Sequence, residues 1–214
     1  MARNITICLA FVVIMAWLMT PSLVTPKSHI DRTSRLYHLR LITLAILDYE
    51  QDNGVFPRST YKNAGLLSWR VELLPYLGEQ KLFEAIDKSV AWDHPRNMQF
   101  HDQMPDVFRD PAINHPSQTS YRIISGAGTG WTNDGPPISF ADIRDGSSNS
   151  IAILSIPKNK TNWLAPTTLT IEYANQEVDF QNRGHCYSMF DGSTSDEEPN
   201  FDWAGSPFLI SDAG

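Results

Sequence analysis

An acidic segment near the C-terminus has the residue types and spacing of a metal site. Serines follow its first aspartate at alternate positions, and a run of three carboxylates comes next. The candidate ligands are Asp191, Asp196, Glu197 and Glu198. Ca²⁺ prefers hard oxygen ligands at alternating positions, but an EF-hand loop needs glycine where Asp196 stands. The segment is interpreted either as a calcium site or as a solvated acidic tail over residues 191–214.

The histidines and hydroxyl residues do not form a recognisable catalytic set. His94 and His101 lie seven residues apart, whereas a zinc-binding pair on a helix is usually four apart and needs a third ligand. We interpret both as surface histidines. His185 opens a predicted strand near Asp191, but no serine lies in a Gly-x-Ser-x-Gly elbow and no cysteine has a defensible histidine partner. The sequence predicts a protein that is not an enzyme.

A glycine triplet at Gly126, Gly128 and Gly130 invites comparison with nucleotide-binding loops. A dinucleotide fingerprint needs its third glycine at the position of Trp131 and then a helix, which the Asn133–Pro137 segment forbids. The Gly-Lys-Ser/Thr ending of a phosphate-binding loop is also missing. We therefore predict an ordinary loop and no nucleotide cofactor.

Composition limits the possible partners. The chain of 214 residues has a net charge of −7, which argues against nucleic acid as a ligand because phosphate binding needs clustered Lys and Arg. Six Asp or Glu and no Lys or Arg follow Phe190. The two cysteines, Cys8 and Cys186, show no zinc-site spacing. If the apolar N-terminal segment anchors the chain in a membrane, the two lie on opposite sides of the membrane boundary and cannot form a disulfide. The fold must therefore rest on packing.

The N-terminal residues 1–26 predict a membrane anchor or a cleaved signal segment. No charged residue occurs between Arg3 and Lys27. The apolar run Ile5–Thr20 would span about 24 Å as a helix, and an extension to Thr25 about 31 Å, against about 30 Å of hydrocarbon. A basic cluster follows the run, so the positive-inside rule taken literally places the domain in the cytoplasm.

Periodicity beyond this segment predicts a single α+β domain over residues 27–214. Apolar residues recur at steps of three and four along a helix that ends at Asn53-Gly54. These residues are Leu39, Ile42, Ile46 and Tyr49. Three short helices are predicted next: Ser68–Leu74, Glu79–Asp87, and one capped by Asp93 that ends before Pro105. The expected core aromatic and aliphatic residues are Trp69, Tyr76, Leu77, Phe83 and Trp92.

The second half of the chain predicts β-structure. Short β-rich runs are separated by Gly, Pro and Asn turn signals. The expected strands are Tyr121–Ser125, Ser150–Ile156, Thr168–Tyr173 and His185–Phe190. We predict a small antiparallel sheet packed on the long N-terminal helix, with the short helices in the first half of the domain.

A series of motifs along the chain resembles a planctomycete-type pseudopilin-like family of unknown function. The motifs, in order, are Leu39-Arg40-x-Ile42-x-Leu44-Ala45-x-x-x-Tyr49, Gly54-x-Phe56-Pro57, Ser68-Trp69-Arg70-Val71, Leu74-Pro75-Tyr76-Leu77, Trp92-Asp93-x-Pro95-x-Asn97, Met104-Pro105-x-Val107-Phe108-Arg109, Thr119-Ser120-Tyr121, Asp145-Gly146-Ser147-Ser148-Asn149 and Phe190-Asp191-Gly192-Ser193. None is specific alone, but they keep the family's order. Two features depart from the family. The prepilin leader motif is missing, with Asn4 where its glutamate would fall, and the last turn is followed by polar residues, so we expect a truncated C-terminal hairpin.

The resemblance implies a pilin-like fold and a non-enzymatic protein of a cell-envelope assembly or secretion apparatus. It implies a single-pass anchor in the cytoplasmic membrane with an extracytoplasmic domain. The alternative is a monomeric anchored or periplasmic binding module, secreted after signal cleavage. Calcium in a C-terminal loop is known for major pseudopilins, which lends the acidic segment an analogy. Because Asn4 is neutral, we expect no homopolymer. We expect contact with other pilin-like proteins through Leu39, Ile42, Ile46 and the apolar run.

Overall fold

The computed structural model describes residues 27–64, 66–126, 128–131, 135–144, 146–177 and 185–197. The chain divides into two compact units, Met1–Ile30 and Asp31–Gly214. The first unit contributes only the opening turn of a helix to the described residues. The predicted anchor over 1–26, Cys8, and residues 198–214 of the acidic tail lie outside them.

Helix α2 (Lys27–Asn53) is the predicted long N-terminal helix. It ends as expected, because Gly54 takes a φ of 71° and its N–H donates to the Glu50 carbonyl at 2.7 Å. The helix buries one face completely, formed by Leu39, Ile42, Ala45 and Ile46. None of the helices in the described residues combines the length and the apolar character that crossing a membrane requires.

The main sheet has four antiparallel strands in the order β2-β3-β5-β6. The strands are β2 (Tyr121–Arg122), β3 (Ile151–Ser155), β5 (Cys186–Met189) and β6 (Thr194–Ser195). A second, two-stranded sheet pairs β1 (Gln118–Thr119) with β4 (Thr161–Asn162). The long helix and the small antiparallel sheets together confirm the predicted α+β class. Strands β5 and β6 form the last hairpin, and the residues after Glu197 lie outside the described ranges, so its predicted truncation stays a prediction.

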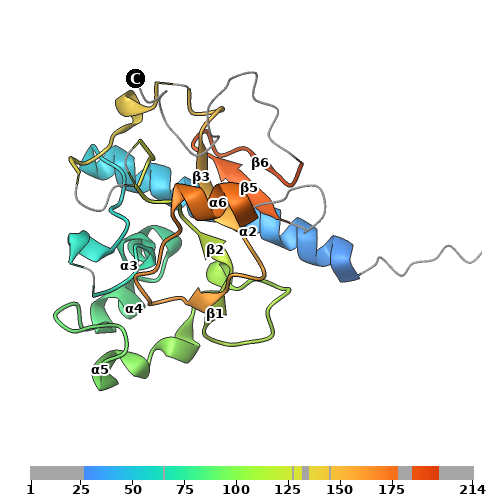
Figure 1. The fold of residues 1–214 in the computed structure, drawn as a ribbon. Helices are drawn as coiled ribbons and strands as arrows, with labels where there is room; N and C mark the ends of the chain where they lie inside the picture. The colour runs from blue at the N-terminus through green and yellow to red at the C-terminus, as the bar shows by residue number, and fades with distance from the viewer. Residues whose placement is uncertain are drawn as a thin grey trace, which may run out of the picture. The chain divides into compact units, whose positions relative to one another are not determined.

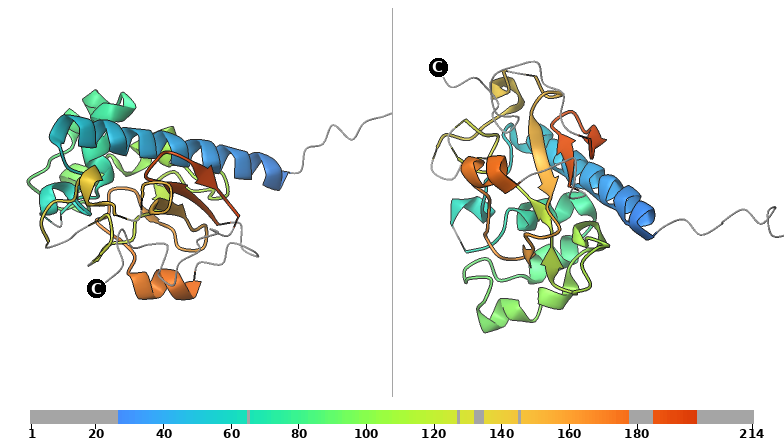
Figure 2. Two further views of the ribbon diagram at one scale, coloured as in Figure 1. Left: turned by 90° about the horizontal axis from the view of Figure 1, so that it is seen from above. Right: turned by 45° about the vertical axis from the view of Figure 1, so that its right-hand side comes forward.

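The main sheet is covered on both faces. All five residues of β3 are buried, with Ala152 and Ile153 in the core shared with α2, and Ile151 and Leu154 in a second core on the other side. Helix α6 (Ile171–Glu177) closes that second core. Figure 2 shows the sheet between α2 and α6. A hydrogen bond from Thr43 Oγ1 to Ser188 Oγ (2.8 Å) fixes α2 against β5.

Helix α6 corrects the strand predicted at Thr168–Tyr173. Only Leu169 is extended there, bridging to Ile124. Thr170 then accepts the Tyr173 N–H at 3.2 Å and starts the helix. Ile171 and Ala174 of this helix pack in the second core, whereas Tyr173 is 38% exposed.

The helical half of the domain is built from short pieces (Figure 1). Its α-helices are α3 (Arg70–Leu73), α4 (Gln80–Ala85) and α5 (Pro95–Met98). Its 3₁₀ turns are η1 (Tyr61–Asn63), η2 (Pro75–Leu77), η3 (His101–Gln103) and η4 (Asp106–Phe108), and η5 (Phe140–Asp142) follows later. The predicted cap Asp93 is wrong: His94 caps α5, its Nδ1 accepting the Arg96 N–H at 3.2 Å.

The core centres on Trp69, which is fully buried as predicted. Its ring lies 5.4 Å from the Trp131 ring and 6.2 Å from the Phe108 ring, centroid to centroid. The other predicted core residues pack at the edge of this core and stay partly exposed: Tyr76, Leu77, Phe83 and Trp92.

The glycine triplet is a loop, as predicted, and the structure supplies the reason for its last member. A Cβ added to Gly130 would come within 3.0 Å of two ring atoms of Phe190. Phe190 is itself fully buried, with its ring 4.9 Å from that of Phe56. Close packing against Phe190 therefore explains the glycine at position 130.

Gly130→Ala is expected to lower the free energy of unfolding by about 1–3 kcal/mol, because the new methyl group overpacks the core. Phe190→Leu shortens the opposing side chain, so the double variant should lose less than the sum of the single losses. Urea denaturation of the four proteins measures this coupling. Strictly additive losses would show that the two side chains do not oppose each other.

Candidate functional site

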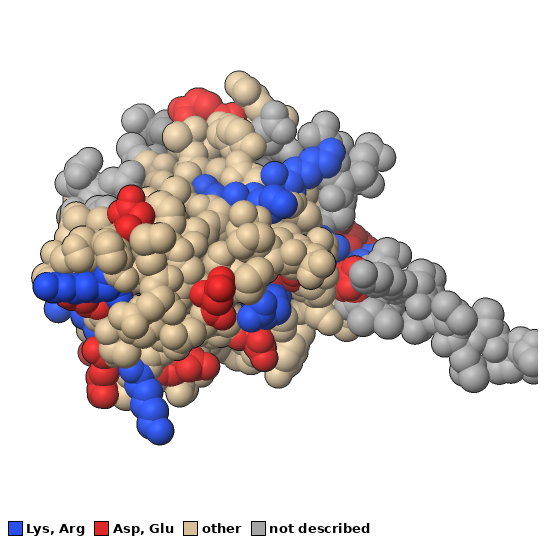
Figure 3. Space-filling model, turned by 90° about the horizontal axis from the view of Figure 1, so that it is seen from below, with Lys and Arg blue, Asp and Glu red and all other residues tan. Residues whose placement is uncertain are grey.

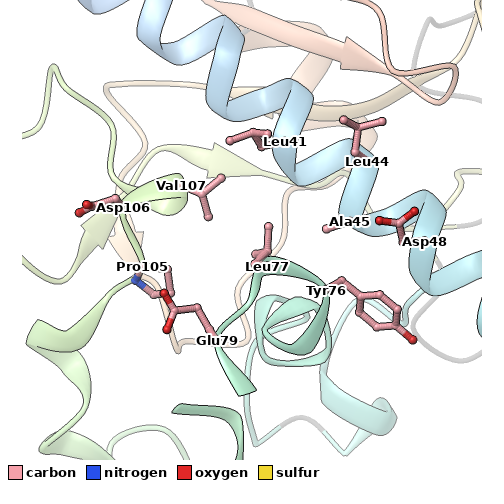
Figure 4. Close-up of a pocket in the computed structure, with 10 residues that line it drawn as sticks. All are labelled: Leu41, Leu44, Ala45, Asp48, Tyr76, Leu77, Glu79, Pro105, Asp106 and Val107. Carbon is pink, nitrogen blue, oxygen red and sulfur yellow. The ribbon is translucent and has the colours of Figure 1, made fainter. Parts of the chain in front are cut away.

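A cavity of about 450 Å³ lies between α2 and the turns η2 and η4. We call it the α2 groove. One wall is formed by Leu41, Leu44, Ala45 and Asp48 of α2. The opposite wall is formed by Tyr76, Leu77, Glu79, Pro105, Asp106 and Val107. Figure 4 shows these side chains around the opening.

Prolines and a left-handed glycine set the position of the wall opposite α2. Pro75 cannot continue α3 and starts η2, which Gly78 ends with a φ of 78°. The Glu79 N–H then donates to the Leu74 carbonyl at 2.9 Å, which turns the chain back along the groove. Pro105 starts η4, and the fully buried Phe108 anchors that turn in the core.

The groove has an apolar floor and an acidic rim. Three carboxylates, of Asp48, Glu79 and Asp106, line it, and no Lys or Arg does. Arg109 Nε lies 3.3 Å from Asp106 Oδ1, which partly neutralises one of the three. Apolar side chains fill the positions between the carboxylates. Such a surface is complementary to an apolar segment that carries a basic group.

An exposed apolar stripe runs along α2 into the groove. Tyr37 is 60% exposed and Leu44 is 44% exposed, and the partly buried Leu41 lies between them. The prediction that a partner protein contacts Leu39, Ile42 and Ile46 is wrong. They are fully buried against the protein's own sheet and are not accessible to a partner. The signal that the sequence prediction missed is a second set of apolar residues, Tyr37, Leu41 and Leu44, which are spaced by four and three residues. This set lies about half a turn around the helix from Leu39, Ile42 and Ile46.

The acidic segment is described only in part. Asp191 Oδ1 accepts two hydrogen bonds from Ser193, from its N–H at 2.8 Å and its Oγ at 2.6 Å. Asp196 forms a salt bridge with Arg32 of α2, which raises the pKa of the Arg32 guanidinium. Within the described ranges no three His, Cys, Asp or Glu side chains gather as a metal site. Glu198 lies outside those ranges, so calcium binding stays a prediction.

The histidines serve structural contacts. His94 caps α5, and His101 stacks on Trp92 with ring centroids 5.5 Å apart. His101 Nε2 also lies 3.0 Å from the Trp92 carbonyl oxygen. His185 is 1% exposed and precedes β5. Each of these three histidines is thus accounted for by packing or by a local hydrogen bond.

Surface charge on the face shown in Figure 3 is mixed. Lys and Arg side chains lie among Asp and Glu side chains on this face. The absence of a nucleic-acid partner stays a prediction from the net charge.

The comparisons with known proteins give one match. Residues 33–130 match the model of a family described as a protein of unknown function (DUF1559). The matched segment contains every residue that lines the α2 groove. It ends before β3, α6 and the acidic segment. No curated protein and no solved structure matches the chain.

Cys186 is buried in β5, and burial raises the pKa of its thiol to about 11. Because the thiolate is the reactive form, alkylation at pH 8 should be about a hundredfold slower in the folded protein than in the urea-unfolded chain. A Cys8→Ser variant removes the other thiol from the assay. Equal rates in the folded and unfolded chains would show that the thiol is accessible.

Proposed function

We propose that this protein is a non-enzymatic, pseudopilin-like component of a cell-envelope assembly or secretion apparatus, and that it docks partner proteins at the α2 groove. One observation carries the proposal. A 27-residue helix packs one face on an antiparallel sheet and leaves an apolar stripe and a groove on another. This arrangement is what a pilin-like subunit needs to pack against a second helix.

The proposed location is the cytoplasmic membrane, with residues 1–26 as a single-pass anchor and the domain extracytoplasmic. The charge-free run after Arg3 supports an anchor, and the pseudopilin resemblance supports the orientation. The proposed partners are the membrane and other pilin-like proteins. The partner segment would present apolar side chains to the groove floor and a basic residue to Asp48 or Glu79.

The docking proposal is tested by photo-crosslinking in native membranes. A benzoylphenylalanine replaces Leu44 in the groove, or Tyr173 on α6 as a control that is similarly exposed (44% and 38%). We expect an adduct with a pilin-like protein from Leu44 only. Asp48→Lys with Glu79→Lys should reduce its yield by about tenfold, since like charges then oppose the basic partner. Equal adducts from both positions, or none from Leu44, would contradict docking at the groove.

The location is tested with a single surface cysteine. In a Cys8→Ser background, Asp102→Cys places a thiol on the exposed turn η3. We expect a membrane-impermeant maleimide to label it in intact spheroplasts, with the protein resisting carbonate extraction. Labelling only after lysis would place the domain in the cytoplasm. A carbonate-soluble chain that begins near Pro21–Lys27 would show a cleaved signal.

A binding module with a pilin-like fold is the second candidate function. It is favoured by a smaller cavity beside the end of α2, which contains a buried carboxylate. A ligand site of this kind is not needed for helix packing.

A further inference from the structure

The smaller cavity, of about 250 Å³, is lined mainly by aromatic rings around one glutamate. The rings belong to Tyr49, Tyr61, Tyr76 and Phe83. Glu72 of α3 contributes the carboxylate and Lys62 of η1 lies at the edge. We call this space the Glu72 cavity. It shares Tyr76 with the α2 groove.

Glu72 is 7% exposed, and its hydrogen bonds are incomplete. Its Oε1 accepts the Lys62 backbone N–H at 2.6 Å. Its Oε2 is buried and has no hydrogen-bond partner in the described part of the chain. Burial raises the pKa of Glu72, while the Lys62 amide, the Tyr49 hydroxyl and the Arg58 amide act against that rise, although neither of the last two meets hydrogen-bond geometry to Oε2. A carboxylate oxygen in this position lacks a donor, and leaving it unmatched is costly.

The surrounding rings already attract cations from the chain itself. Lys62 Nζ lies 5.6 Å from the Tyr61 ring centroid, and Lys88 Nζ lies 4.1 Å from that of Phe83. The rings are also paired with each other, Tyr49 with Tyr76 at 5.7 Å and Tyr61 with Phe83 at 6.4 Å between centroids. Ring faces and a carboxylate both favour positive charge, so the whole cavity selects a cation.

The backbone beside the cavity is strained. Lys62 has a φ of 46°, and it is the one non-glycine residue with positive φ among those described. Its amide hydrogen bond to Glu72 holds this conformation. Strained residues cluster at binding sites, where the surrounding structure maintains them. A purely structural role for Glu72 would explain the bond to Oε1 but not the lack of a donor at Oε2.

We propose that the Glu72 cavity binds a primary ammonium or guanidinium group on an apolar stem, the chemistry of a lysine or arginine side chain or of a small aliphatic amine. The stem contacts the rings, and an N–H of the charged group donates to Glu72 Oε2. Because Oε2 is shielded from water, a small rotation of the carboxylate accompanies binding. This inference does not depend on docking at the α2 groove.

The test uses the full-length protein with fluorotyrosine labels, followed by ¹⁹F NMR. The probes are n-butylammonium, n-butylguanidinium and the neutral comparator 1-butanol. We expect both cations to shift the Tyr49, Tyr61 and Tyr76 signals saturably at millimolar concentration, and to leave Tyr173 unchanged. 1-Butanol should bind at least about tenfold more weakly, because it lacks the charge. An acetyl-Gly-Lys-Gly-amide peptide distinguishes a protein-borne lysine from a free amine.

Two matched variants assign the binding to the carboxylate. Glu72→Gln should weaken cation binding at least tenfold, whereas Glu172→Gln, the same change at an exposed position of α6 that lines neither cavity, should leave it unchanged. Lys62→Ala removes a competing ammonium and should strengthen binding, so the proposal remains testable even if Glu72→Gln does not fold. Equal binding of butanol and butylammonium, or full binding by a folded Glu72→Gln, would overturn the proposal. Loss of binding in Lys62→Ala would overturn it as well.

Discussion

The fold depends on a buried arginine that forms no salt bridge with a carboxylate of the described residues. Arg70 is 0% exposed, and burial lowers the pKa of its guanidinium well below the ordinary value. The side chain donates to Ser68 Oγ at 2.8 Å, to the Trp163 carbonyl at 3.5 Å and to the Tyr121 carbonyl. Its guanidinium carbon lies 4.5 Å from the Trp69 ring centroid. Carbonyl dipoles and a ring face thus replace the counter-ion that a buried cation normally needs.

This contact joins the two halves of the domain. Arg70 opens α3 in the helical half, Tyr121 lies in the main sheet, and Trp163 follows the second sheet directly. Glu72 is two residues further along α3, and η2 begins at Pro75. The arginine therefore positions one wall of the α2 groove and the carboxylate of the Glu72 cavity together. Both features lie within residues 33–130, the segment that matches the family of unknown function.

Sequence patterns predicted the parts of the fold that depend on local periodicity. The long helix, its glycine stop and the strands at Ile151–Ser155 and Cys186–Met189 were visible as spacing and turn signals. Helix α6 was missed, because short apolar runs fit a strand or a helix until their packing is known. The close packing that requires a glycine at position 130 could not be predicted either, because Phe190 is 60 residues away in sequence.

The candidate sites could not be predicted for a related reason. The α2 groove and the Glu72 cavity each combine residues from α2 with residues from later turns, and no local motif marks them. Among the sequence signals that suggested chemistry, Gly130 proved to be a packing residue, His94 a helix cap and His101 a stacking partner of Trp92. The acidic segment stays untested, because it is described only in part. Glu72 looked like an ordinary helix residue. Glu72 differs from an ordinary helix residue in its burial and in having a hydrogen-bond partner at only one of its two carboxylate oxygens.

The most direct test of the account is amide hydrogen exchange of Arg70→Met, compared with Arg122→Met. Arg122 is also buried, with a pKa lowered to about 10, but it donates to the Thr168 carbonyl at 3.2 Å, in the segment before α6. The account predicts that Arg70→Met speeds exchange in α3, η2 and β2 together, with at least about 2 kcal/mol lost through its orphaned carbonyls. Arg122→Met should affect only the region around Thr168. Unchanged protection of α3 and β2 in Arg70→Met would contradict the claim that this cation holds the two halves together.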